Sequence, residues 1–416
     1  MAGEWKRVTV SEVCELIVDC VNKTAPVVEE LTPYKMLRTT NIKGGRINLK
    51  ECRRVSKDTF VKWTRRAEVR HGDIILTREA PLGEVGYVDF TDTVFLGQRL
   101  MQYRSKPALL EPRFLLYSFL SKDLQNQFGA HEGSGSTVSH IRVGDCLKFE
   151  LKLPPLAEQK AIAAVLGALD DKIELNRRMN ATLEAMARAL FQSWFVDFDP
   201  VHAKLSGRRP AGLDQATAGL FPASFQESSI GPIPKEWEVG RLDDVLTLQR
   251  GFDLPATART YGKYQVMAAS GHNGCHDKFM VHGPGVTTGR SGVLGKVFFI
   301  HGDFWPLNTS LWVKEFKRVS PAYTFHLLRG LDFEMFNAGS AVPTLNRNHV
   351  HNLPVVVPPK PIIIAFDAQV MPLMKQQKAN DDQSRTLATL RDALLPKLLS
   401  GKLSVAAAAL AKEGRA

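Results

Sequence analysis

The sequence predicts an α+β fold in which two mixed α/β domains form a pseudo-two-fold repeat and are separated by two long antiparallel coiled-coil helices. Two observations lead to this prediction. An apolar heptad pattern without a proline runs through residues 157–199, and landmarks of the first half of the chain recur in the second half. A seven-residue apolar period indicates a helix with a seam, and recurrence over a long interval indicates a duplicated unit.

These landmarks divide the chain into five parts. We expect a first domain over residues 1–153, spacer helix 1 over 154–199, a linker over 200–236, a second domain over 237–357, and spacer helix 2 with a C-terminal tail over 358–416. Each domain is expected to contain short strands and helices bounded by glycine and proline turns. The composition of the linker predicts an irregular connector, because it contains Pro210, Gly212, Pro222, Gly231, Pro232 and Pro234 among small polar residues.

The two halves match in three successive blocks. Trp5 matches Trp237, the segment TREAPLGEV from Thr77 matches GRSGVLGKV from Gly289, and the segment from Gly135 matches that from Gly339. The offset falls from 232 to 212 and then to 204 residues, so the second half lacks 20 residues before its glycine-containing turn and 8 more before its GS segment. The halves therefore share a frame but differ in content.

The long helix also repeats, with an asparagine at the middle of each seam. Two antiparallel helices would cross with both asparagines near the centre, where such residues specify register. The competing interpretation is that each asparagine is solvated on a helix that packs against its own domain. Pro372 is expected to interrupt the second helix, whose regular part would begin only there.

The expected helix–helix and subunit interface consists of Ile162, Leu169, Asn176, Leu183, Leu190, Phe366, Leu373, Asn380, Leu387 and Leu394.

Composition indicates a globular protein with a polyanionic partner. The 416 residues are 44% hydrophobic and 23% charged, with a formal net charge of +11 and a pI near 9.4. The five cysteines are scattered without a CxxC pair, which is typical of reduced thiols rather than a disulfide framework. The N-terminus lacks an apolar signal core and no apolar run is long enough to span a membrane, so we expect a cytoplasmic protein.

Duplex DNA suits a pseudo-two-fold protein with two unlike heads. Heads separated by roughly 50 Å would bind about one and a half turns apart and would read a non-palindromic site. The first domain carries a basic run in which only Glu51 and Asp58 are acidic, a composition typical of phosphate binding, although a solvated basic surface is the alternative. The basic residues are Arg38, Lys43, Arg46, Lys50, Arg53, Arg54, Lys57, Lys62, Arg65 and Arg66.

Base readout requires paired donors and acceptors on loops that can enter a groove. Arg78 and Arg290 match within otherwise divergent loops, which indicates a shared DNA-backbone or framework role. In the first domain the candidates are Arg78, Gln98, Arg99, Ser134, Ser136, Thr137, Ser139, His140 and Arg142. In the second domain they are Arg250, Arg259, Lys263, Asn273, Arg290, Ser291, Asn308, Thr309, Asn346, Arg347 and Asn348.

Several segments resemble the specificity subunit of type I restriction-modification systems. They are LPPLAEQKAIAAVLGALDDKIELNRRMNATLEAMARALFQSWFVDFDP, the connector pieces GRRPAG, LFPASF and GPIPKEW, the pair GSTVSHIRVGD and GSAVPTLNRNHV, and LRDALLPKLLSGKL. The resemblance implies two target-recognition domains that each read one half of a bipartite DNA site, and helices that set the spacer and dock two methyltransferase subunits. It also implies motor-nuclease subunits in the complete complex, with S-adenosylmethionine, ATP and Mg²⁺ bound by those partners and no cofactor bound by this chain. The second helix departs from the pattern, because Pro361, Ile362 and Ile363 replace the acidic start.

Two other protein classes share some of these features. The triplet Glu158-Gln159-Lys160 imitates a nuclease core, but Glu158 opens a helix, where an acidic residue complements free amides, so we expect no catalytic residue in this chain. His272, Cys275 and His276 lie in one polar loop without a fourth ligand, so we expect no metal site. The alternative function is a DNA-binding transcriptional regulator built as a fused dimer, which would share the DNA-binding argument.

Overall fold

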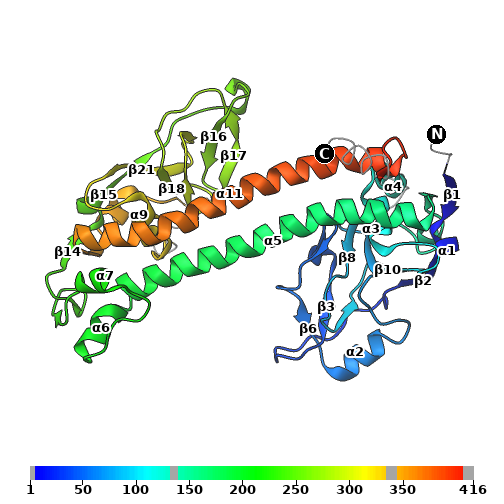
Figure 1. Ribbon diagram of the computed structural model, residues 1–416, viewed down its shortest axis with the longest axis horizontal. Coiled ribbons are helices and arrows are strands. Elements are labelled where there is room, and N and C mark those ends of the chain that lie inside the picture. The colour runs from blue at the N-terminus through cyan, green and yellow to red at the C-terminus, as the bar shows by residue number, and fades with distance from the viewer. Residues whose placement is uncertain (1–4, 132–138, 334–343, 406–416) are drawn as a thin grey trace, which may run out of the picture. The chain divides into compact units, whose positions relative to one another are not determined.

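The chain folds into two compact units in the computed structural model, which describes residues 5–131, 139–333 and 344–405 (Figure 1). Unit 1 comprises residues 1–176 and 382–416, and unit 2 comprises residues 177–381. The helices α5 (Leu156–Phe195) and α11 (Lys360–Leu399) are both 40 residues long, and each contributes one half to each unit. The predicted site residues Ser134, Ser136 and Thr137 lie outside the described residues.

Unit 1 contains a four-stranded antiparallel sheet in the order β2-β10-β7-β8, on which α3 and α4 pack. A three-stranded sheet in the order β6-β3-β9 includes one parallel pair, and β1 pairs with β11 just before α5. The elements are β1 (Lys6–Thr9), α1 (Val10–Val13), β2 (Cys14–Asp19), β3 (Lys35–Leu37), η1 (Thr39–Asn41), β4 (Ile42–Lys43), β5 (Arg46–Ile47), β6 (Arg53–Arg54), α2 (Lys57–Trp63), β7 (Ile74–Arg78), β8 (Leu82–Tyr87), β9 (Val94–Leu96), β10 (Leu100–Ser105), α3 (Pro112–Leu120), α4 (Lys122–Gly129), η2 (Asp145–Leu147) and β11 (Glu150–Leu153).

Unit 2 repeats this arrangement with the strand orders β15-β21-β18-β19, β17-β16-β20 and β14-β22. Helix α9 packs on β18 and β19 of the four-stranded sheet. The matching strand orders confirm the predicted α+β class and the duplication. The elements are β14 (Glu238–Arg241), α8 (Leu242–Val245), β15 (Leu246–Arg250), η3 (Ala256–Ala258), β16 (Tyr264–Ala268), β17 (Gly271–His276), β18 (Gly285–Gly289), β19 (Val297–Ile300), β20 (Phe304–Pro306), β21 (Ser310–Phe316), α9 (Pro321–Arg329), α10 (Arg347–His351) and β22 (Pro354–Val357).

The long helices pair in antiparallel fashion within each unit. In unit 1 the Asn176 side chain is fully buried, and its Nδ2 donates to Gln383 Oε1 at 2.8 Å and to Ser384 Oγ at 3.2 Å. In unit 2 the Nδ2 of buried Asn380 donates to Asn180 Oδ1 at 2.8 Å. The first half of α5 therefore packs against the second half of α11 in unit 1, and the second half of α5 packs against the first half of α11 in unit 2.

Pro372 does not interrupt α11, so the prediction that the regular helix begins at this residue is wrong. A proline inside a helix leaves the carbonyl of residue i−4 without its N–H partner. Here both Pro372 and Ala368 are exposed, so the affected carbonyl lies on the side of the helix that faces water. The helix starts at Lys360 with Pro361 in its first turn, where a missing N–H costs nothing.

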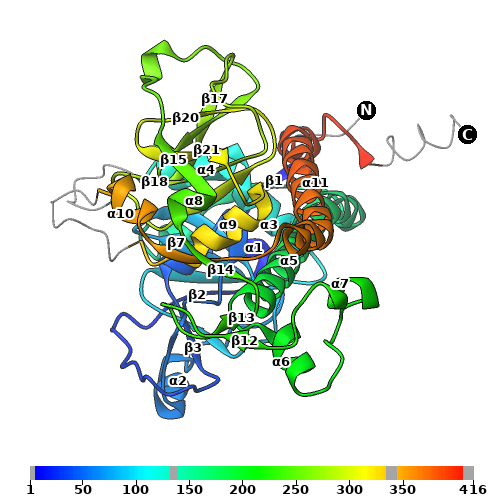
Figure 2. The same ribbon diagram turned by 90° about the vertical axis from the view of Figure 1, so that its left-hand side faces the viewer.

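The connector between α5 and β14 is more regular than its composition predicts, and the prediction of an irregular connector is wrong. Its elements are α6 (Asp199–Leu205), α7 (Gln215–Gly219), β12 (Phe225–Gln226) and β13 (Ile233–Pro234). Val201, Phe221 and Ile233 are buried in the core of unit 2, which anchors the segment. Figure 2 shows these short elements gathered in one lobe. Proline and glycine end the elements here rather than prevent them.

Candidate nucleic-acid interface

The loops that follow β3, β7 and β9 meet at one edge of unit 1. Strands β3 and β9 run parallel and end together, and the Gly97 N–H donates to the Leu37 carbonyl at 2.8 Å. A Cβ on Gly97 would lie 2.5 Å from that carbonyl oxygen, so only glycine permits the close approach. Strand β7 ends at Arg78, next to the start of β10.

Hydrogen bonds join these loops into one surface, the first edge (residues 38–41, 78–82, 97–99 and 139–142). The Thr39 hydroxyl donates to the Ala80 carbonyl at 2.8 Å, and the Arg78 N–H donates to the Arg99 carbonyl at 2.8 Å. The Ile141 N–H donates to the Arg78 carbonyl at 2.9 Å, which adds the fourth loop. Segments far apart in the sequence therefore present their side chains together.

The predicted DNA-binding residues on the first edge differ in how free their side chains are. Gln98, Arg99 and Arg142 are exposed, and two of them have partners: Arg99 Nε lies 3.4 Å from Glu79 Oε1, and Gln98 Oε1 accepts a bond from the Thr24 hydroxyl at 3.4 Å. Arg99 has a φ of 71°, a left-handed conformation that is costly for a residue with a side chain and is concentrated at functional sites. The half-buried Arg38 and Arg78 donate to the Glu51 carbonyl at 3.2 Å and the Ile141 carbonyl at 3.1 Å, so part of each guanidinium group holds the loops together. Ser139 and His140 are half-buried on the same edge.

Unit 2 forms a matching surface, the second edge (residues 250–253, 289–292, 307–309 and 344–347). The Arg290 N–H donates to the Thr309 carbonyl at 2.8 Å, and the Leu345 N–H donates to the Arg290 carbonyl at 2.8 Å. These two backbone bonds repeat the pair that Arg78 makes in unit 1, so the two units share one backbone frame at this position. The predicted residues on this edge are Arg250, Arg290, Ser291, Asn308, Thr309, Asn346 and Arg347.

The two edges carry different polar side chains at matched positions. The shared backbone bonds align Arg99 with Thr309, and hence Gln98 with Asn308. In the fourth loop Arg142 aligns with Asn346. A common frame that presents different donors and acceptors suits two surfaces that read different base sequences.

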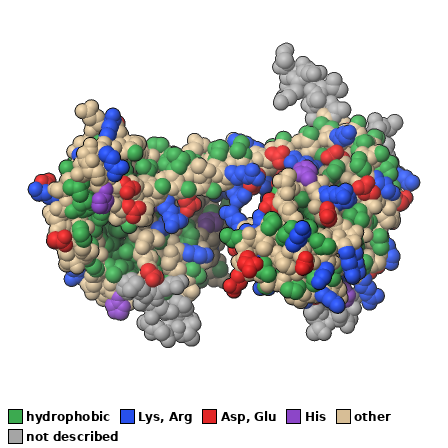
Figure 3. Space-filling model, turned by 90° about the horizontal axis from the view of Figure 1, so that it is seen from below, with side chains coloured by type: hydrophobic (Ala, Val, Ile, Leu, Met, Phe, Trp, Pro, Cys, Tyr) green, Lys and Arg blue, Asp and Glu red, His purple; other side chains and the backbone are tan. Residues whose placement is uncertain are grey.

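The basic run of unit 1 lies mostly beside the first edge rather than on it. Arg53 and Arg54 form β6, and Lys62, Arg65 and Arg66 lie at the end of α2 or just after it. Arg66 forms an ion pair with Asp19, whose neighbour Cys20 donates its N–H to the Leu100 carbonyl at 3.3 Å, so Arg66 borders the first edge. Figure 3 shows Lys and Arg side chains gathered in several groups over unit 1.

Four predicted residues have other surroundings. Arg259 Nη1 donates to the Asn273 carbonyl at 2.7 Å and to its Oδ1 at 2.8 Å, which places both residues, with Lys263, at the β16–β17 hairpin rather than on the second edge. Arg46 Nη1 donates to Glu174 Oε2 of α5 at 2.6 Å. The basic run does not predict this ion pair, because Glu174 lies far along the chain from Arg46.

No cluster of three His, Cys, Asp or Glu side chains that could hold a metal ion occurs among the described residues. Cys275 Sγ lies 3.7 Å from His272 Nε2, whereas His276 Nδ1 lies 3.2 Å from the Thr260 carbonyl. Burial raises the pKa of Cys146, near the first edge, to about 11, so its thiol is neutral at physiological pH. Within the ranges that the structure describes, no helix has the length and apolar character needed to cross a membrane.

Comparisons with known proteins agree with this architecture. The chain is 26% identical over 364 residues to the type I restriction enzyme MjaIX specificity subunit of Methanocaldococcus jannaschii, covering 80% of this chain and 78% of the relative. It is 25% identical over 406 residues to the HindI specificity subunit of Haemophilus influenzae, covering 80% of this chain and 87% of the relative. The fold is similar to that of a type I restriction-modification S subunit from M. genitalium, with a TM-score of 0.59, 18% identity, and coverage of 95% of this chain and 96% of that chain.

The family match covers both repeated halves. The model of the type I restriction modification DNA specificity domain matches residues 2–185 and 234–380. The two matched segments correspond to the two halves that the repeat defines, and together they account for most of the chain. The chain therefore belongs to the family of type I restriction modification DNA specificity domains.

Proposed function

We propose that this chain is the DNA sequence-recognition subunit of a type I restriction-modification complex. Each edge reads one half of a bipartite, non-palindromic site. The observation that carries this proposal is that the two edges share one set of backbone bonds, around Arg78 in the first and Arg290 in the second. At two matched positions their side chains differ: Gln98 and Arg99 in the first edge correspond to Asn308 and Thr309 in the second. The framework positions each surface, and the differing side chains select the bases.

The remaining roles follow from the helices and from the relatives. Helices α5 and α11 set the spacer between the half-sites and dock two methyltransferase subunits, and motor-nuclease subunits complete the complex. Methyl transfer, ATP hydrolysis and cleavage belong to those partners, which bind S-adenosylmethionine, ATP and Mg²⁺, so this chain is not itself an enzyme. The complex works in the cytoplasm. A fused-dimer transcriptional regulator is not favoured, because the relatives are specificity subunits.

Exposed basic residues beside the first edge supply phosphate contacts. Arg53, Lys62 and Arg65 are exposed, and each phosphate contact contributes about 0.9 to the slope of log affinity against log salt. Replacing all three by alanine is expected to weaken binding to every sequence and to flatten this slope. An unchanged slope would remove this surface from the proposed interface.

The central experiment is sequencing of methylated DNA from cells that carry this chain with its methyltransferase partners. The native chain is expected to direct methylation to one bipartite motif. Gln98→Asn exchanges one matched pair without altering the left-handed residue Arg99, and it should change only one half of that motif. The reciprocal Asn308→Gln is the matched control and should change only the other half. Changes in both halves, or in neither, would contradict the assignment of one half-site to each edge.

A further inference from the structure

The acidic residue Asp170 of α5 joins three other elements of unit 1 at one point. Its Oδ2 accepts a hydrogen bond from the Tyr117 hydroxyl of α3 at 2.8 Å, and its Oδ1 accepts one from Arg391 Nη1 of α11 at 2.6 Å. Its backbone carbonyl accepts a bond from Arg46 Nη2 of β5 at 2.9 Å. The head and both long helices therefore meet at a single carboxylate-bearing residue.

Two further ion pairs surround this point. Arg46 Nη1 also donates to Glu174 Oε2, one helical turn beyond Asp170, at 2.6 Å. Arg113 of α3 binds both carboxylate oxygens of Asp171 at 2.8 and 3.0 Å, a bidentate geometry that restricts orientation as well as distance. Burial and the charge of Asp170 raise the pKa of Tyr117, so this hydroxyl remains a proton donor at physiological pH. We call this set of residues the Asp170 junction.

The Asp170 junction connects directly to the first edge. Arg46 lies on the β4–β5 hairpin, which is held to β8 by the Gly45 N–H donating to the Val85 carbonyl at 2.9 Å. Just before β4, the turn that contains Thr39 is bonded to Ala80 of the first edge. Only a few residues of chain separate Arg46 from Thr39, so a displacement of Arg46 would also displace the first edge.

Unit 2 has none of these side chains at the matched positions. Asp170 corresponds to Met374 and Arg391 to Ala187, while Tyr117 and Arg113 correspond to His326 and Ala322 at the same turns of α9. All four unit 2 residues are buried. Arg46 has no counterpart because its hairpin lies in the stretch that is shorter in the second half. The polar residues are thus replaced as a group. The polar pairs of unit 2, Arg329 with Glu184 and Ser320 with Asp367, lie at other positions, so this arrangement is specific to the first head.

On the basis of the proposed function, we infer that the Asp170 junction is a positioning site that holds the first edge at a defined orientation to the helix pair. Arg46 acts in this junction and not as a phosphate ligand. Its ion pair with Glu174 joins a guanidinium group that is 41% exposed to a carboxylate that is only 15% exposed, so the pair is shielded from salt on the Glu174 side. A defined orientation of one head makes recognition sensitive to the length of the spacer as well as to its half-site.

The test uses the full chain assembled with its methyltransferase partners. Binding is measured to duplexes with the native spacer and with spacers one base pair longer or shorter. Asp170→Ala is expected to reduce discrimination between these spacers about tenfold, less than the largest cost of one wrong base pair. Base preference in the half-site of the second head should stay unchanged. Tyr117→Phe removes one hydrogen bond without an isolated charge and should act in the same direction with a smaller effect.

Arg385→Ala provides the control, since Arg385 also lies on α11 but pairs with Asp382 on the same helix. This variant should keep the native spacer discrimination. A merely structural role for Asp170 would lower the folded fraction and affect binding to all spacers equally. Unchanged discrimination in folded Asp170→Ala, or an equal loss of preference at both half-sites, would overturn the inference.

A measurement without DNA separates this inference from the proposed function. Spin labels at Lys62→Cys in the head and Thr389→Cys on α11, with Cys52 and Cys275 replaced by serine, report the distance distribution within unit 1. The distribution should be narrow in the native background and broad after Asp170→Ala. If this broadening occurred but the native complex showed no sequence-specific DNA binding, the proposed function would be wrong and the positioning role of the Asp170 junction would be supported. An equally narrow distance distribution in both proteins would overturn the inference about the Asp170 junction and would leave the proposed function unaffected.

Discussion

The two units attach their heads to the helix pair by different physical means. In unit 1 directional polar groups around Asp170 and the side-chain amide of buried Gln159 add to an apolar contact, and the position of Gln159 is taken in unit 2 by the apolar Ile363. In unit 2 a cluster of aromatic rings dominates the contact, in which Phe366 lies 5.2 Å from Phe195 and 5.9 Å from Phe191 between ring centroids. The polar pairs of unit 2, Arg329 with Glu184 and Ser320 with Asp367, lie at other positions. The same arrangement of strands and helices therefore tolerates either kind of contact. Burial of apolar surface is non-directional, whereas a polar junction needs all of its partners in place.

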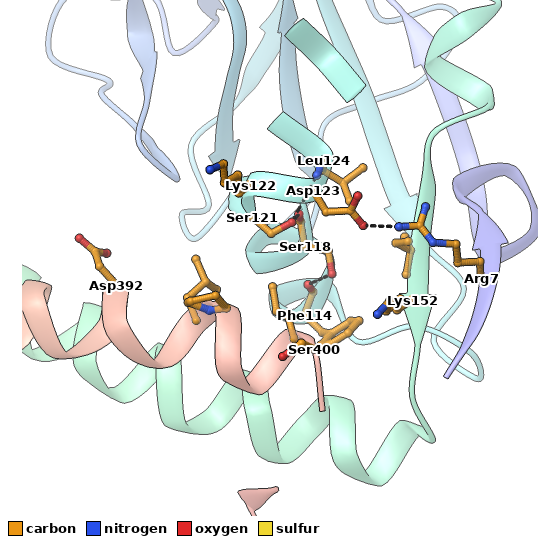
Figure 4. A pocket seen from close by; sticks show the side chains of 14 residues that line it. Arg7, Phe114, Ser118, Ser121, Lys122, Asp123, Leu124, Lys152, Asp392 and Ser400 are labelled. Carbon is orange, nitrogen blue, oxygen red and sulfur yellow. Dashed lines mark hydrogen bonds and ion pairs between the residues drawn. The ribbon is translucent and has the colours of Figure 1, made fainter. Parts of the chain in front are cut away.

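The same contrast explains a groove in unit 1. Leu395 and Leu399 of α11 line a cavity of about 480 Å³ together with Phe114 of α3 (Figure 4). The matched residues in unit 2 are Phe191 and Phe195, and both rings pack against Tyr323, the counterpart of Phe114. Smaller side chains at two matched positions thus leave space in unit 1 that rings fill in unit 2.

The largest expected effect is the loss of the central ring of unit 2. Phe366 is fully buried and contacts five aromatic neighbours, so Phe366→Ala should destabilise unit 2 by about 4 kcal/mol. Hydrogen exchange of amides in β18 and β21 measures this change, with amides in β7 and β10 reporting unit 1. Ile364→Ala, at a 57% exposed position of the same helix, should change exchange little. Equal acceleration in both units would show that the units do not unfold separately.

A second effect depends on pH. Burial, and then the charge of Arg329, lowers the pKa of His326 in unit 2 to about 4. In the unfolded chain this histidine takes up a proton near pH 6.5, so the native state binds fewer protons between pH 6.5 and 4, and stability falls as the pH falls through this window. The loss should reach about 3 kcal/mol at pH 4.

His326→Leu isolates this contribution, because the carboxylates that titrate in the same range are present in both proteins. Denaturant unfolding of the two proteins from pH 7 to pH 4 should show the native chain losing about 3 kcal/mol of stability relative to the variant as the pH falls. Tyr117 stands at the matched position of unit 1 and takes up no proton in this range. Parallel curves would mean that the pKa of His326 is the same in the folded unit as in the unfolded chain.

Periodic features of the sequence predict the frame of this molecule well. The heptad positions around Asn176 and Asn380 predict two antiparallel helices, and the recurring landmarks predict two heads with one strand order. The prediction that Pro372 interrupts the second helix is wrong, because it considers only the local sequence. Pro372 lies within α11, and the carbonyl that it deprives of a partner is on the water-facing side. A proline rule cannot tell which side of a helix faces water until the packing is known.

The candidate site is predicted by residue type but not by arrangement. Arg99 and Asn308 are recognisable as potential base contacts, yet the convergence of their loops depends on parallel pairs, β3–β9 and β16–β20, that leave no periodic signal. The basic neighbours of Arg46 predict a phosphate contact, whereas its side chain binds Glu174, 128 positions away. Contacts of this range depend on the tertiary fold, which local patterns do not encode.

The Asp170 junction can be converted to the residues of unit 2 to test how its polar groups depend on each other. Asp170→Met alone leaves the half-buried Arg391 without that carboxylate and should destabilise unit 1 by about 2 kcal/mol. Arg391 then keeps only its pair with the exposed Asp392, so adding Arg391→Ala removes a poorly compensated charge, and the double variant should be closer to the native stability than the single one. Denaturant unfolding measures the cycle, and the exposed pair Asp382 and Arg385 gives a reference coupling below about 0.5 kcal/mol. Additive single effects would contradict the dependence.

The smallest expected effect comes from filling the groove of unit 1. Leu395→Phe places at this position the ring that unit 2 carries at Phe191, and should stabilise unit 1 by about 0.5 to 1 kcal/mol through added apolar burial. Hydrogen exchange at the C-terminal end of α11 should slow accordingly. Leu390→Phe adds the same ring at a 46% exposed position of the same helix and should give no gain. Destabilisation by Leu395→Phe would mean that Phe114 and its neighbours cannot accommodate a ring, and that the two units differ in backbone spacing as well as in side-chain size.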